Sequence, residues 1–69
     1  MAEIKATITG KIKEINITVG QALTEDDEAI IIEAMKMENV MYGEEGTVKE
    51  IFVKVGDSVE EDQVLATVE

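Results

Sequence analysis

Three stretches of the chain alternate apolar and polar residues, a pattern typical of strands with one buried face. They are residues 11–13, 15–19 and 51–55. Isoleucine and valine supply most of the apolar positions, and their branched side chains fit a pleated surface. Gly20 and Gly56 follow the two longer stretches, and glycine is common in turns. The pattern therefore predicts an all-β domain built from short strands.

The sequence repeats itself at a shift of 36 residues. Residues 13–15 and 49–51 both read Lys-Glu-Ile, and a Val-Gly pair recurs at 19–20 and 55–56. Four apolar pairs also match at this shift, namely Ile12 with Val48, Ile17 with Val53, Leu23 with Val59, and Ile32 with Val68. Each half is too small to bury its own apolar face. We therefore expect the halves, residues 1–33 and 37–69, to share one core about an approximate two-fold axis.

The joint between the halves carries conflicting local signals. Residues 28–39 are rich in Glu, Ala, Met and Lys, which favour a helix. The equivalent region of the second half, residues 64–68, has the composition of a strand. Following the repeat, we predict a strand at 28–34, a tight turn at 35–36 and a strand from 37. The turn residues, Met and Lys, are not the Asn-Gly or Asp-Gly that two-residue hairpins prefer, which indicates that they serve another purpose.

Composition limits the classes of function that are open to the chain. It has 69 residues, 16 of them acidic, no arginine and a formal net charge of −10. This length allows one small domain, residues 1–69. The acidic surface disfavours nucleic acid and anionic membranes as partners. No apolar run is long enough for a membrane span and no signal-peptide pattern opens the chain, so we expect a cytoplasmic domain without membrane insertion.

The chain contains neither cysteine nor histidine. Their absence excludes thiolate nucleophiles, Ser-His arrangements and the usual ligands of transition metals. The acidic run at residues 25–28 lacks the spacing of a calcium loop, and we interpret it as a solvated turn. We therefore expect no catalytic residue and no metal site.

Residues 33–39, which read EAMKMEN, closely resemble the biotin-attachment motif of biotin carboxyl carrier domains. The flanking repeats at 10–20 and 46–57 also resemble the biotinyl/lipoyl-attachment family, so the resemblance covers nearly the whole chain. It implies a flattened β-barrel, or barrel-sandwich hybrid, of two four-stranded antiparallel sheets with pseudo-two-fold symmetry. It also implies that the modified lysine lies on an exposed hairpin, with both chain ends at the opposite edge.

The resemblance further implies a function for individual residues. Lys36 is expected to be biotinylated by a biotin protein ligase. The covalently attached biotin then carries a carboxyl group from a biotin carboxylase to a carboxyltransferase, or serves a decarboxylase. Recognition by these partners is expected to involve Ala34, Met35, Met37 and Glu38.

The chain departs from the family at three points, and two alternatives stay open. Thr9 stands where relatives usually carry proline, Tyr42-Gly43 stands where they often have Ala-Pro, and no protruding thumb is inserted between the repeats. One alternative is a lipoyl carrier domain of an acyl-transfer complex, although lipoyl relatives usually have Asp where this chain has Met35. The other alternative is an unmodified small β interaction module.

Overall fold

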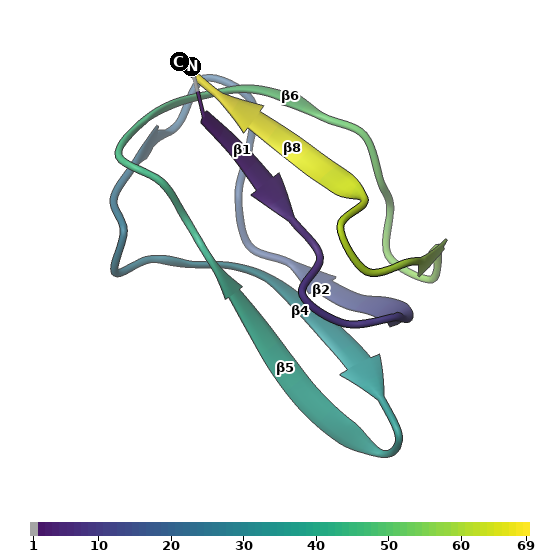
Figure 1. Ribbon diagram of the computed structural model, residues 1–69. Coiled ribbons are helices and arrows are strands. Elements are labelled where there is room, and N and C mark those ends of the chain that lie inside the picture. The colour runs from purple at the N-terminus through teal and green to yellow at the C-terminus, as the bar shows by residue number, and fades with distance from the viewer. Residues whose placement is uncertain (1) are drawn as a thin grey trace.

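The computed structural model describes residues 2–69, which form eight β-strands (Figure 1). Within these residues no helix is long and apolar enough to cross a membrane. The strands are β1 (Ala2–Lys5), β2 (Gly10–Ile15), β3 (Ala22–Leu23), β4 (Glu28–Ala34), β5 (Met37–Tyr42), β6 (Gly46–Ile51), β7 (Ser58–Val59) and β8 (Val64–Val68).

The strands form two four-stranded sheets that reproduce the sequence repeat. One sheet has the order β1-β8-β6-β3 and the other has the order β5-β4-β2-β7, and every pairing is antiparallel. Exchanging each strand for its repeat equivalent converts the first order into the second. The predicted flattened barrel with pseudo-two-fold symmetry is thus confirmed.

Corresponding turns of the two halves are closed by the same bond, even where the side chains differ. In each turn a side-chain oxygen accepts a hydrogen bond from the backbone N–H three residues earlier, a local alternative to ladder bonding. The donor–acceptor residues are Thr18–Gln21, Lys54–Asp57, Thr24–Asp27 and Glu60–Gln63, with distances of 2.9 to 3.0 Å. The acidic run at 25–28 therefore includes a turn closed by Asp27, as the interpretation of a solvated turn requires.

The core is shared between the halves. All eight residues of the four apolar pairs identified by the repeat are buried, with exposed fractions of 7% or less. They belong to a single cluster between the two sheets. Because burial of apolar surface is the main favourable term in folding, neither half is expected to fold alone.

Two stretches that alternate do not form strands. β2 ends at Ile15 and β6 ends at Ile51, so the predictions of strands at residues 15–19 and 51–55 were wrong beyond the first residue of each. Val19 and Val55 lie in turns, 60% and 64% exposed. The reason is that residues 16–20 cross between the sheets: Gly20 N–H donates to the carbonyl of Val48 in the other sheet, at 2.8 Å.

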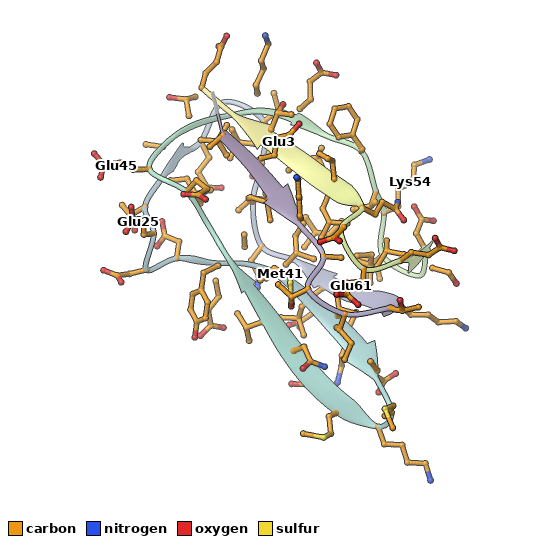
Figure 2. The ribbon with its side chains drawn as sticks, viewed as in Figure 1. Glu3, Glu25, Met41, Glu45, Lys54 and Glu61 are labelled. Atoms are coloured by element: carbon orange, nitrogen blue, oxygen red, sulfur yellow. The ribbon has the colours of Figure 1, made fainter. Side chains whose placement is uncertain are left out.

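The repeat shift differs by one residue in the first strand of each half. Ile4 pairs with Ala66, whereas Met41 pairs with Ile30, so Ile4 and Met41 are equivalent at a shift of 37. The predicted equal halves are therefore offset by one residue here, because the connection from β1 to β2 is longer than the one from β5 to β6. Figure 2 shows Met41 pointing into the interior, where its sulfur accepts hydrogen bonds of 3.4 Å from the N–H and hydroxyl of Thr7.

Candidate functional site

The hairpin between β4 and β5 projects from the end of the molecule opposite the two chain termini (Figure 1). Its register is regular up to the tip, with Glu33 opposite Glu38 and Ala34 opposite Met37. Only two residues, Met35 and Lys36, connect the strands. The predicted strand–turn–strand arrangement is confirmed, and the helix favoured by local composition does not form.

Both residues of the turn have left-handed backbone angles. The φ angle is 54° at Met35 and 65° at Lys36. A two-residue turn with both φ angles positive matches the right-handed twist of the flanking strands, which is why Asn-Gly is preferred in such turns. For residues with a Cβ atom this conformation costs about 1–2 kcal/mol each. The hairpin thus carries backbone strain at Met35 and Lys36, within the segment that resembles the biotin-attachment motif.

The side chains at the tip are open to solvent. Met35 is 89% exposed and Met37 is 66% exposed. Lys36 is exposed as well, and within residues 2–69 it forms no ion pair and no side-chain hydrogen bond. Ala34 differs from these three residues, because it is only 8% exposed. Of the predicted recognition residues, Met35, Met37 and Glu38 therefore lie on the surface, whereas Ala34 packs inward.

Gly10 at the start of β2 positions the base of the hairpin. A Cβ atom at this position would lie 2.5 Å from the carbonyl oxygen of Glu33 and 3.0 Å from the Cβ of Ala34. Only glycine allows strand β2 to approach β4 this closely. The close approach supports the hairpin up to Ala34, so the turn extends from a rigid sheet rather than from a loop.

Charged side chains of both signs lie beside the hairpin. Lys11 on β2 lies opposite Glu33 on β4, which in turn lies opposite Glu38 on β5. Lys13 forms an ion pair and a hydrogen bond with Glu38. The hydrogen bond and negative charge of Glu38 raise the pKa of the Lys13 ammonium above its ordinary value. The attachment motif contains Glu38 but gives no sign of its partner, because Lys13 is 25 residues away in the sequence.

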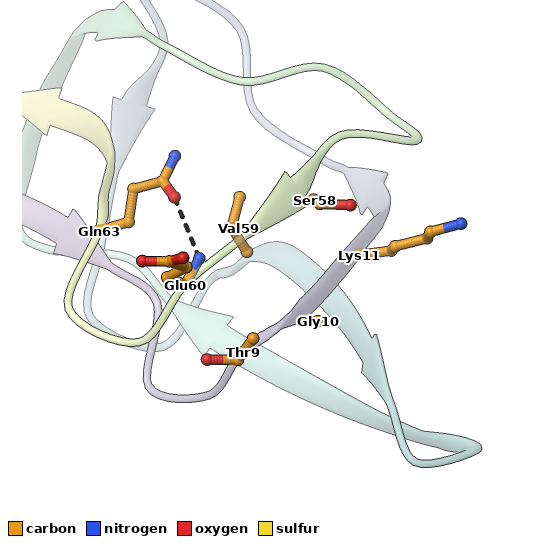
Figure 3. Close-up of a pocket in the computed structure, with 7 residues that line it drawn as sticks. All are labelled: Thr9, Gly10, Lys11, Ser58, Val59, Glu60 and Gln63. Carbon is orange, nitrogen blue, oxygen red and sulfur yellow. Dashed lines mark hydrogen bonds between the residues drawn. The ribbon is translucent and has the colours of Figure 1, made fainter.

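A surface pocket of about 440 Å³ lies at the β7 edge of the sheet that contains the hairpin, between residues 9–11 and residues 58–60 (Figure 3). Gln63 closes one side, where its side-chain oxygen accepts a hydrogen bond from Glu60 N–H at 3.0 Å. Lys11, Ser58 and Glu60 line the pocket, but among residues 2–69 no hydrogen bond or ion pair joins their side chains, as acid–base or nucleophilic chemistry would require. The exposed amine on the hairpin is therefore the stronger candidate for a functional group.

Comparison with known proteins identifies the family. A family model described as biotin-requiring enzyme, which covers biotin and lipoyl domains, matches residues 3–68. The chain belongs to this family. The cofactor of the chain is biotin. Covalent attachment of biotin requires a reactive side chain that another protein can reach, and the exposed lysine of the hairpin meets this requirement.

Relatives of the chain include carboxylases and a carrier protein. The chain is 36% identical over 67 residues to the propionyl-CoA carboxylase alpha chain of Homo sapiens, covering 96% of this chain and 9% of that one. It is 38% identical over 64 residues to the biotin carboxyl carrier protein of Streptococcus mutans, covering 91% of this chain and 49% of that one. The chain thus spans at most about half the length of these relatives.

Solved structures give the same assignment. The urea carboxylase of Kluyveromyces lactis matches with a TM-score of 0.89 and 33% identity, over 99% of this chain and 6% of that one. A single-chain, multi-domain long-chain acyl-CoA carboxylase matches with a TM-score of 0.79 at 19% identity, which supports the fold alone. The family match and the relatives above 30% identity support assignment of the chain as a biotin carboxyl carrier domain of carboxylases, a type of domain that is not catalytic by itself.

Proposed function

We propose that Lys36 is the residue to which biotin is covalently attached, and that the domain carries a carboxyl group between two partner active sites. The observation that supports this proposal is the position of the lysine. Its amine is exposed at the tip of a two-residue turn, between two exposed methionines, at the end of the molecule farthest from both termini (Figure 1).

Attachment requires an activated acyl donor from a separate ligase. An ordinary lysine has a pKa of about 10.4, so at neutral pH only about one amine in a thousand is unprotonated and nucleophilic. The unprotonated Lys36 Nζ attacks the acyl carbon and forms the N–C bond, and the leaving group departs with the electron pair of the bond that breaks. The nitrogen, positively charged after the attack, then loses one proton to a base and becomes a neutral amide. The domain has no histidine or cysteine to assist this step. A biotin protein ligase therefore supplies both the activated acyl group and the local base.

The exposed methionines suit a surface that several proteins recognise in turn. Their thioether side chains are flexible and polarizable, so they can pack against differently shaped partners. Met35 and Met37 flank the amine, and Glu38 follows on the same strand. We assign to these three residues recognition by the ligase, the biotin carboxylase and the carboxyltransferase or decarboxylase. Ala34, which is buried and pairs with Met37, helps to fix their position.

The fold contributes a fixed starting point for a long arm. When attached, biotin accepts and releases a carboxyl group, and the chain itself performs no step of that chemistry. The hairpin holds the lysine backbone at one place on a rigid sheet. Tethering then replaces diffusion of free cofactor with a high effective concentration at each partner site.

Intact mass spectrometry after co-expression with a biotin protein ligase tests the proposal. We expect one added biotinyl group, which Lys36→Arg abolishes. Lys54→Arg is the matched control, because Lys54 is also an exposed lysine in a turn, and it should leave the modification intact. A lipoyl group added by a lipoyl ligase would assign the domain to the alternative carrier class. Absence of modification by both ligases would leave the unmodified interaction module.

A further inference from the structure

Lys13 lies at a β-bulge on the outer face of the sheet, near the hairpin. The register between β2 and β4 shifts between Ile12 and Glu14, so Lys13 is the extra residue of the bulge. Bulges bend a strand and redirect a side chain. From this position the Lys13 ammonium reaches Glu38 on β5, with strand β4 between them. The two strands are separated by two strand spacings, about 10 Å. The Lys13–Glu38 ion pair therefore links the edge strand β5 to β2 across β4.

The second half of the molecule contains the same lysine without an attachment site. Lys49 is the repeat equivalent of Lys13 and occupies the corresponding bulge in β6. It pairs with Glu69 at 3.3 Å, and Glu69 is the repeat equivalent of Glu33. Lys13 instead pairs with Glu38 across the hairpin. The difference in partner distinguishes the sheet that contains the exposed lysine turn from the other sheet.

Glu38 is the carboxylate nearest in sequence to Lys36, two residues away. A carboxylate beside an amine stabilises the charged ammonium, and an ammonium has no lone pair with which to attack an acyl carbon. In the structure Glu38 is engaged by Lys13, while Lys36 has no ion-pair partner among residues 2–69. The charged groups that act on Lys13 are Glu38 on β5, Glu33 on β4 and Glu14 on β2, and Glu33 lies directly opposite Glu38.

We propose that Lys13 is a positioning residue of the attachment site: its ion pair with Glu38 keeps that carboxylate away from the Lys36 amine. The amine then remains free to lose its proton and accept an acyl group. This inference rests on the proposed function only in taking the acyl group to be biotin. The availability of the amine does not depend on that function. One exposed ion pair changes an equilibrium by about two- to fivefold, and we expect an effect of that size.

Acylation of the intact chain by a small activated ester, the N-hydroxysuccinimide ester of acetic acid, tests the proposal without any ligase. The rate at Lys36 is followed by peptide mapping at pH 7.5. We expect Lys13→Gln to lower this rate about two- to fivefold and to move the pH profile of labelling at Lys36 to higher pH. Lys49→Gln removes the equivalent lysine at the far end of the molecule and should leave the rate unchanged.

A double-mutant cycle separates positioning from a general loosening of the hairpin. If Glu38 is the competing carboxylate, Lys13→Gln combined with Glu38→Gln should restore the rate to that of Glu38→Gln alone. A rate for Lys13→Gln equal to that of Lys49→Gln would overturn the proposal. So would a double variant as slow as Lys13→Gln. Failure of a biotin ligase to modify the native chain would refute the proposed function instead, and the ester rates would still decide the role of Lys13.

Discussion

Replacing the strained lysine of the turn by glycine should stabilise the domain. The φ angle of Lys36 is 65°, in the left-handed region that glycine occupies without steric cost. The strain at a residue with a Cβ atom is about 1–2 kcal/mol, and glycine adds about 0.5–1 kcal/mol of chain entropy to the unfolded state. The difference predicts that Lys36→Gly raises the free energy of unfolding by about 0.5–1 kcal/mol.

Thermal unfolding followed by far-ultraviolet circular dichroism measures this effect. In a domain of this size a change of about 1 kcal/mol shifts Tm by about 4–8 °C, so an increase of several degrees is expected. Lys36→Arg keeps a Cβ atom in the turn and should unfold within about 2–4 °C of the native chain, because exposed substitutions usually change stability by less than about 0.5 kcal/mol.

The same substitution at a second exposed turn lysine should have the opposite sign. Lys54 lies in the turn closed by Asp57 and is not among the residues of the described chain with positive φ. Lys54→Gly therefore adds chain entropy to the unfolded state without relieving strain in the folded state. It should lower the free energy of unfolding by about 0.5–1 kcal/mol. If Lys36→Gly lowers Tm as Lys54→Gly does, the hairpin turn is not strained and this reasoning is wrong.

Four further predictions concern the support of the hairpin and its surroundings. Gly10→Ala should lower the free energy of unfolding by about 1–3 kcal/mol in urea titrations, because its Cβ would lie 2.5 Å from the carbonyl oxygen of Glu33; an unchanged midpoint would contradict the close approach. Ile32→Ala removes a core side chain with 0% exposure and should cost about 2–5 kcal/mol in the same assay. Glu38 raises the pKa of Lys13, so the stability contribution of this pair should be complete below the ordinary lysine pKa of 10.5 and decline as pH rises through the raised value. The stability difference between the native chain and Lys13→Gln would therefore shrink at high pH, and a difference that grows would contradict the assignment. The net charge of −10 should steer the domain to basic surfaces on the proposed carboxylation partners, so turnover with them should fall as salt rises, and a flat response would exclude steering.

The strand content, the two-fold organisation and the resemblance of residues 33–39 to the biotin-attachment motif all follow from the order of the amino acids alone. They rest on local patterns that recur at one shift, and that shift pairs residues of the core such as Ile12 and Val48. The repeat also argues correctly against a helix at the joint, because the second copy of that region has the composition of a strand. The position of Lys36 on a two-residue turn follows from the same alignment.

The ends of the strands and the meetings of distant side chains depend instead on how the two halves pack. Alternation continues to Val19 and Val55, but the chain leaves the sheet after Ile15 and Ile51 because it must cross to the other layer. No local pattern records that crossing, since it depends on hydrogen bonds to the opposite half. The pairing of Lys13 with Glu38 likewise depends on the order of three strands, which the spacing of the two residues does not encode.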